Sequence, residues 1–314
     1  MKNKLLIIIM MIISSYNLYS QGCSDAGLCT IQMNHDDKAS SLNYNYSIGL
    51  GLSSNNVLIN SYKMTLFYSP LDKVTIFAGL PFSIINGNLG TQTGVGDIDF
   101  GIQYALHLEN EHLIKYSMSL KSSLDREERY TIFPSGIAEP LPMVYHPSLG
   151  NDNLIIVIDY LFDKWEISGG VLIPFTQPNN NMFITNSDLD NSIVPYIFDE
   201  YLTSAGLERS EDVMIRAKRE VYKTDKFTVK AGINPIYRLS NNIVNFIENG
   251  VDKSFEIEGS GGLTLNIIGD INYQLSESTF LTFAIGIPTI ARQNQNDGLL
   301  RMFQANLSIS GSIF

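Results

Sequence analysis

The sequence predicts an all-β protein, a transmembrane up-and-down antiparallel β-barrel of about 12 strands with short periplasmic turns and long extracellular loops. Three observations lead to this prediction. Apolar residues recur at every second position in many segments, the connections between segments alternate between short and long, and aromatic residues gather beside the short connections.

Residues 1–20 have the layout of a secretory signal peptide. Lys2 and Lys4 precede a nine-residue apolar run, Leu5–Ile13, and a more polar stretch follows it. The run is shorter than the roughly 20 residues of a membrane helix. We expect cleavage after Ser20 and export from the cytoplasm. A lipid anchor at Cys23 is a weaker alternative, because no aliphatic residue stands three positions before it.

Residues 21–40 show no strand pattern and are expected to form a periplasmic tail or a plug that reaches into the lumen. The segment holds both cysteines of the chain, Cys23 and Cys29, and an exported protein can form a disulfide between them. A metal site would need two further ligands, which His35 alone does not provide.

The net charge argues against one class of partner. The whole chain carries a formal charge of -11, and loss of Lys2 and Lys4 with the signal peptide makes it -13. Nucleic-acid binders neutralise phosphates with an excess of Lys and Arg. We therefore expect no nucleic-acid partner.

The barrel is expected to occupy residues 41–314. Alternation of apolar and polar residues predicts twelve strands, at 42–52, 57–68, 74–84, 97–108, 112–123, 153–162, 165–175, 212–222, 227–239, 263–275, 279–290 and 299–313. The segment 212–222 alternates least clearly, because charged residues stand on both of its phases.

The connections after every second strand are short, with little more than SPLDK, ENE, DK, KTDK and SES. Those between are longer, the largest being about 125–152 and 176–211. Short turns at one end and long loops at the other are typical of outer-membrane barrels, and an even strand number places both termini at the short-turn end.

The residues on the two phases indicate which face meets lipid. The polar phase carries mostly Asn, Ser, Thr, Gly and Gln, whereas a sheet exposed to water would carry more Lys and Glu. Aromatic residues on the apolar phase lie near the short turns, as in an interfacial girdle: Tyr68, Tyr104, Tyr160, Trp165, Phe227 and Tyr273. The apolar phase is therefore predicted to face lipid. A secreted β-sandwich with these aromatics in its core is the alternative.

The stretch GVGDIDFGIQYAL, residues 94–106, begins like a phosphate-binding loop but continues with alternation of period two. A phosphate loop needs a helix N-terminus, so we interpret the stretch as a strand entering the wall after a long loop. Asp97 and Asp99 then face the lumen. Pro81, Gly94 and Gly96 mark a candidate seam between the strands at 74–84 and 97–108, because proline donates no ladder hydrogen bond.

The same phase rule gives a set of lumen-facing, candidate ligand-contacting residues. They are Asp97, Asp99, Gln103, Lys115, Asp159, Lys230, Asn234, Arg238, Asp270 and Asn272. Their mixed signs argue against a pore that strongly selects anions or cations.

The stretch 79–106, GLPFSIINGNLGTQTGVGDIDFGIQYAL, resembles the outer-membrane proteins named for the meta pathway of phenol degradation. The matching positions are Gly79, Pro81, Gly94, Gly96 and Asp97. The resemblance implies a channel related in architecture to long-chain fatty acid transporters, with small and often hydrophobic compounds as cargo.

The function expected from these patterns is an outer-membrane channel or transporter for small hydrophobic or amphipathic solutes in a Gram-negative cell. Its partners would be outer-membrane lipid, the solute and the barrel-assembly machinery. A structural or adhesive barrel is an alternative. An outer-membrane hydrolase is a further one, although no motif supports a site at His146 and Asp152. We expect no catalytic residues, cofactor or metal.

Overall fold

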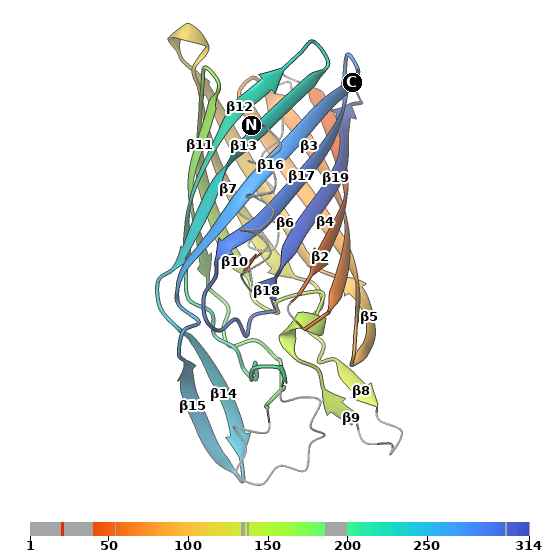
Figure 1. Cartoon of the computed structure of the whole chain (residues 1–314), viewed down its shortest axis with the longest axis vertical. Coiled ribbons are helices and arrows are strands. Elements are labelled where there is room, and N and C mark those ends of the chain that lie inside the picture. The colour runs from red at the N-terminus through yellow and green to blue at the C-terminus, as the bar shows by residue number, and fades with distance from the viewer. Residues whose placement is uncertain are drawn as a thin grey trace, which may run out of the picture.

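The computed structural model describes residues 20–21, 40–53, 55–132, 136, 138–185, 200–298 and 300–313. Twelve long antiparallel strands form a closed barrel (Figure 1). They are β2 (Ser41–Leu52), β3 (Leu58–Leu71), β4 (Val74–Gly87), β6 (Asp97–His107), β7 (Leu113–Ser123), β10 (Asn153–Phe162), β11 (Trp165–Pro174), β12 (Asp212–Lys223), β13 (Phe227–Arg238), β16 (Gly262–Ser276), β17 (Thr279–Ile290) and β19 (Phe303–Ser312).

The topology is up-and-down, as the sequence predicts. Each wall strand pairs with its neighbours in sequence, and β19 pairs with β2 to close the ring, with Ser312 opposite Asn43. The start of β2 and the end of β19 therefore lie together at the short-turn end. Among the described residues, no helix is long and apolar enough to cross a bilayer.

Smaller elements accompany the wall, most of them at the long-loop end (Figure 1). They are β1 (Ser20–Gln21), β5 (Gly90–Val95), β8 (Tyr130–Ile132), β9 (Ala138–Pro140), β14 (Asn242–Glu248), β15 (Val251–Ile257), β18 (Leu300–Arg301) and the 3-10 turns η1 (Glu109–Glu111) and η2 (Met143–Tyr145). The β14–β15 hairpin projects from the barrel and was not among the predicted strands.

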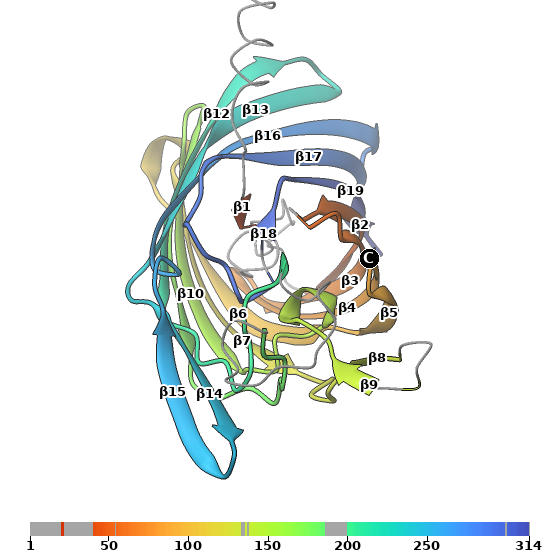
Figure 2. The same cartoon turned by 60° about the horizontal axis from the view of Figure 1, so that its bottom comes forward.

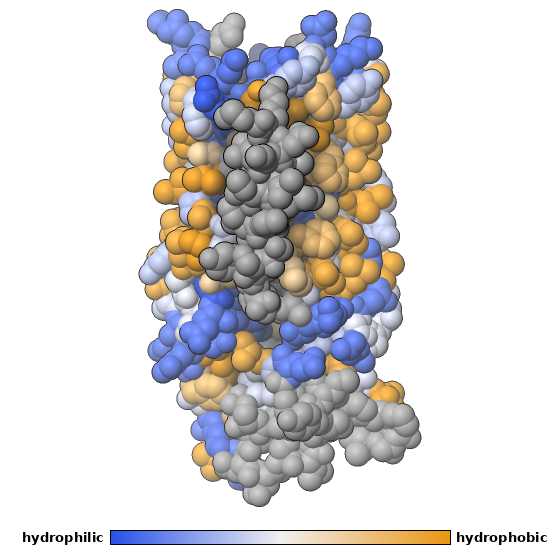
Figure 3. All heavy atoms as spheres, in the orientation of Figure 1, coloured by the Kyte–Doolittle hydropathy of each residue, from blue (hydrophilic) through white to orange (hydrophobic). Residues whose placement is uncertain are grey.

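The wall presents apolar side chains outward and polar ones inward. On β6, Phe100 is 50% exposed while the adjacent Asp99 is 8% exposed. On the face shown in Figure 3, hydrophobic residues lie at mid-height on both sides, with hydrophilic residues above and below them. A water-soluble barrel would have the opposite arrangement, because apolar surface of this extent is stable only in an apolar environment.

The predicted aromatic girdle lies on the outer surface near the short turns. Tyr68, Tyr104, Trp165 and Tyr273 are each about two-fifths exposed. Arg219 lies over the Trp165 ring, 5.4 Å from its centroid. Arg219 is one of the residues that obscured the alternation of β12, and its outward position explains that irregularity.

The wall is irregular where β5 and β6 meet. β4 pairs with β6 as far as Gly79 opposite Asp99, and with β5 from Phe82 opposite Val95. Two residues of β4 thus face three on the other side, which is a β-bulge. Gly96 N donates to Pro81 O at 3.0 Å inside this bulge.

The N-terminal predictions fall largely outside the described residues. The Cys23–Cys29 disulfide and the rest of the segment 22–39 are not described. The expected cleavage site lies inside β1, which pairs with β18. Figure 2 shows β1 and β18 within the ring of wall strands.

Candidate functional site: the barrel lumen

One cavity of the lumen, which we call the vestibule, measures about 570 Å³. Its lining includes residues 223–226 of the turn between β12 and β13, so it lies at the short-turn end. One side of its wall, on β2 and β19, carries only uncharged polar lining residues: Asn45, Ser47, Gln304, Asn306, Ser308 and Ser310. The opposite side is charged.

The charged side forms a ladder of ion pairs across β10 to β16. Glu166 lies 3.0 Å from Lys218 Nζ and 3.1 Å from Lys230 Nζ. Lys218 Nζ also contacts Asp270 Oδ1 at 3.0 Å, and Arg216 contacts Asp159 at 3.4 Å. These groups lie on neighbouring strands with the same inward phase, so the register of the barrel brings them together.

Part of the inward phase is apolar. Seven buried side chains make one cluster, which we call the inner belt: Phe67, Phe77, Ile155, Val157, Leu172, Met214 and Ile236. Phe77 reaches over the neighbouring strand at Gly101, where an added Cβ would lie 2.7 Å from the Phe77 ring. The lumen therefore contains both charged groups and a packed apolar cluster.

A second cavity, which we call the outer chamber, lies between the wall and the loops at the long-loop end and measures about 130 Å³. Two ion pairs line it. Lys63 Nζ is 3.0 Å from Asp99, and Lys121 Nζ is 3.4 Å from Asp97. Asp97 also accepts a hydrogen bond from Ser148 of the loop that follows β7.

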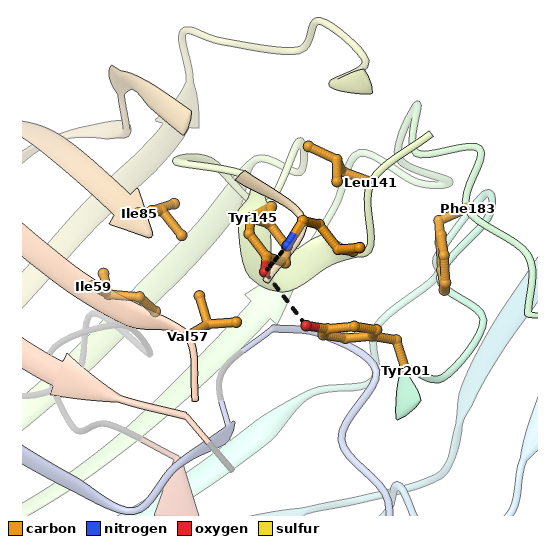
Figure 4. Packing of buried hydrophobic residues seen from close by; sticks show 8 residues of the cluster. Val57, Ile59, Ile85, Leu141, Tyr145, Phe183 and Tyr201 are labelled. Atoms are coloured by element: carbon orange, nitrogen blue, oxygen red, sulfur yellow. Dashed lines mark hydrogen bonds between the residues drawn. The ribbon is translucent and has the colours of Figure 1, made fainter. Parts of the chain in front are cut away.

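The loops over the outer chamber pack against one another in a layer. We call this layer the lid, and it comprises residues 138–152, 175–185 and 200–211. Its apolar core joins the lid to the ends of β3 and β4 (Figure 4) and contains Val57, Ile59, Ile85, Leu89, Leu141, Tyr145, Phe183 and Tyr201. The Tyr145 hydroxyl accepts a hydrogen bond from Leu89 N at 3.0 Å and lies 3.4 Å from the Tyr201 hydroxyl.

A buried ionic cluster ties the lid to β12, β13 and the loop before β18. Arg238 binds Asp212 through Nε and Nη2, both at 2.8 Å, and Asp297 through Nη1 at 2.6 Å. Arg209 and Arg292 complete this Arg–Asp cluster, with nitrogens 3.6 Å from Asp297 Oδ2. Bidentate guanidinium contacts of this kind fix geometry as well as charge.

The charges in the cluster set the pKa values of its loop residues. Burial alone would raise the pKa of Asp297, but Arg238, Arg292 and Arg209 together hold that pKa well below its ordinary value. Burial and the charge of Arg238 lower the pKa of Arg292 to about 10, against the opposing effect of Asp297. Asp297 and Arg292 therefore remain charged at neutral pH.

The structure places the ten predicted lumen residues in four locations. Six line the vestibule: Gln103, Lys115, Asp159, Lys230, Asp270 and Asn272. Asp97 and Asp99 line the outer chamber. Arg238 belongs to the Arg–Asp cluster, and Asn234 is buried on β13, with its carbonyl 3.4 Å from Asn266 Nδ2.

Several lumen residues were missed at the sequence level. Lys63, Lys121, Glu166, Arg216 and Lys218 share the inward phase with the predicted residues, so the phase rule alone would have found them. The inner belt had a different signal. Residues 154–158 are apolar at every position, which indicates a strand with two apolar faces.

The two residues of the hydrolase alternative have different partners. Asp152 accepts hydrogen bonds from Ser122, Ser123 N and Arg126. His146 Nε2 lies 3.4 Å from Glu128 and 2.9 Å from Asn181 Nδ2. The contacts of His146 connect parts of the outer loops, and those of Asp152 join it to the end of β7 and to the loop that follows β7.

No protein-family model matches the chain, and no curated protein matches it. Among solved structures the chain is similar to the COG4313 outer membrane channel from Pseudomonas putida F1, with a TM-score of 0.56 and 14% identity, covering 90% of this chain and 100% of that one. This likeness shows a shared fold.

Two weaker matches are also outer-membrane barrels by fold. The transport unit of the autotransporter AIDA-I from Escherichia coli has a TM-score of 0.47 and 9% identity, covering 92% of this chain and 95% of that one. The Ralstonia pickettii toluene transporter TbuX has a TM-score of 0.40 and 9% identity, covering 87% and 89%. Neither carries an argument about function.

Proposed function

We propose that this protein is an outer-membrane channel for small hydrophobic or amphipathic solutes. The observation that carries the proposal is a barrel with an apolar outer band and a lumen that contains a cavity of about 570 Å³. Small-molecule binding sites typically have volumes of about 300–1,000 Å³. Apolar side chains such as Ile59, Ile85 and Leu149 line the outer chamber, and they support an apolar component of the cargo.

The resemblance to the meta-pathway outer-membrane proteins supports the same class of cargo. It rests on Gly79, Pro81, Gly94, Gly96 and Asp97, of which Asp97 faces the outer chamber. Membership of that family is part of the proposal. So are the signal peptide and the location in the outer membrane.

The test compares uptake with conductance. Cells with and without the protein are given a radiolabelled small aromatic solute, and the purified protein is reconstituted in planar bilayers. In cells that carry the protein we expect the initial uptake of the solute to be faster and saturable. In bilayers we expect a small ion conductance. Equal uptake with no conductance would contradict the proposal and favour the structural or adhesive barrel.

A further inference from the structure

The vestibule and the outer chamber adjoin at one place in the lumen. Three residues line both cavities: Ser47, Lys63 and Asn306. Lys63 is the charged member of the three, and its Nζ lies 3.0 Å from either oxygen of Asp99. The Lys63–Asp99 ion pair therefore stands where a solute would move from one cavity to the other.

The wall is shaped to hold this ion pair. Lys63 lies on β3 and Asp99 on β6, so the pair spans the intervening strand β4 at Gly79. A Cβ at Gly79 would lie 2.5 Å from Asp99 Oδ1 and 2.7 Å from Lys63 Cε. A larger residue at position 79 would therefore push the ends of both side chains aside.

The outer chamber has the size of a single ring. Its volume of about 130 Å³ is close to that of an engineered protein cavity of roughly 150 Å³ that binds benzene. Apolar side chains from the wall and the lid line it: Ile59, Ile85, Met143, Val144, Leu149 and Ile155.

The charges that line the chamber are balanced. Asp99 pairs with Lys63 and Asp97 pairs with Lys121. Asp297, which also lines the chamber, is bound by Arg238. A charged solute would give up its hydration and would have to compete with an existing ion pair for a counter-charge, which is unfavourable in a buried site.

We propose that the outer chamber binds one uncharged, ring-sized amphipathic molecule and that the Lys63–Asp99 ion pair is the gate between this chamber and the vestibule. A hydroxyl group on such a molecule accepts a hydrogen bond from Lys63 and donates one to Asp99 while both charges stay in place. The inference rests on the proposed function and adds the chemistry of the cargo and the position of the gate.

The experiment measures block of the ion current in planar bilayers by three probes of equal ring size: benzyl alcohol, benzoate and benzylammonium. In the native protein we expect saturable block by benzyl alcohol and little block by either ion. In K63A/D99A we expect severalfold higher conductance and loss of the benzyl alcohol block. The milder K63Q/D99N keeps the side-chain volumes and should show the same direction of change.

The matched control is an ion pair far from the lumen, between Lys253 and Glu248 on the β14–β15 hairpin. The variant K253Q/E248Q should conduct and be blocked like the native protein. A slower gel mobility after boiling verifies that each variant forms a closed barrel.

The outcomes separate the two proposals. Equal block of the native protein by benzoate or benzylammonium would overturn the neutral-ligand site while leaving the channel function intact. Native behaviour in both Lys63–Asp99 variants would overturn the gate. Absence of any ion current or solute effect in the native protein would refute the channel function itself.

Discussion

The side chain of Asp97 lines the outer chamber, whereas other groups hold the strand on which it lies. Its carboxylate lines the outer chamber, 3.4 Å from Lys121 Nζ, and accepts a hydrogen bond from Ser148. The backbone of β6 is held independently by its ladders with β4 and β7. Side-chain changes at this position should therefore affect the chamber more than the barrel.

We predict that Asp97→Asn alters solute passage and ion selectivity more than folding. The amide still accepts a hydrogen bond from Ser148, but the negative charge that balances Lys121 is lost. Reversal potentials in a salt gradient should shift toward anion preference, with unchanged heat-dependent mobility on gels. Asp152→Asn is the control, because Asp152 lies in an exposed loop pair with Arg126. Unfolding of Asp97→Asn without a selectivity change would refute the prediction.

Asp297 is a contrasting case, since the lid depends on it. Its side chain has no exposed surface and binds Arg238 at 2.6 Å. Removal of one partner from a buried ion pair typically costs about 3–5 kcal/mol, because the remaining charge stays buried. We predict that Asp297→Asn loosens the lid, seen as faster proteolysis at residues 200–211, whereas Arg126→Gln in the exposed pair changes it little.

The lowered pKa of Asp297 also fixes the pH range of this effect. A carboxylate with a depressed pKa in the folded state contributes stability at pH values above its unfolded pKa of about 4, and loses it only as the pH falls through the lower folded value. Proteolysis of the lid in the native protein should therefore be the same at pH 5 and pH 7. A marked increase at pH 5 would show that another group controls the lid.

At the scale of elements, the period of two was sufficient to predict all twelve wall strands. It works because inward and outward residues meet different solvents at nearly every position, for example at Asp99 and Phe100. It fails where that contrast ends. β5 consists mostly of Gly90, Gly94 and polar residues, so its two faces do not differ in polarity, and this strand was not predicted.

The β14–β15 hairpin had a local signal that the strand search did not use. Asn249 and Gly250 both have positive φ, 52° and 77°, as a type I′ turn requires. An Asn-Gly pair between alternating residues is the strongest short-range indication of a hairpin. The lid, by contrast, depends on contacts between residues more than 50 positions apart, such as Tyr145 and Tyr201, and no local pattern encodes them.

The seam between the strands at 74–84 and 97–108, marked by Pro81, Gly94 and Gly96, stays a prediction. β4 stays paired on both sides of Pro81. A gap in the backbone pairing lies on the side of β5 that faces away from β4. β7 pairs with β6 only as far as Ser123 opposite Asp97, and β5 pairs with β4 alone among the described strands. We propose that any sideways exit into the membrane lies there.

A sideways exit beside β5 can be tested with an engineered disulfide. An added Cβ at Gly94 would lie 2.7 Å from Asp125 Oδ2, so a disulfide between G94C and D125C would close the gap beside β5. We expect it to slow uptake of apolar solutes and to spare small ions. A disulfide between I84C and T93C joins positions already paired on β4 and β5 and serves as the control. Unchanged apolar uptake in the oxidised G94C/D125C protein would refute the lateral exit.

At the scale of the whole molecule, the two ends of the barrel have different roles. The vestibule reaches the short turns, whereas at the long-loop end the described loops pack into the lid through an apolar core and the Arg–Asp cluster. A solute that arrives from the long-loop side meets these loops first. The orientation of the barrel in the membrane therefore decides whether a solute from outside the cell meets the lid or the vestibule first.

We predict that the long-loop end faces the cell exterior. Long loops of outer-membrane barrels are extracellular and their turns periplasmic. A protease added to intact cells should cut within 125–152 or 176–211 and leave the turns at 69–73 and 109–111 uncut, because the outer membrane shields them. Disrupted cells are the control, in which the short turns become accessible. Cleavage of the short turns in intact cells would require the opposite orientation. A protein that stays soluble without detergent would exclude the membrane barrel, because the apolar outer surface needs lipid around it.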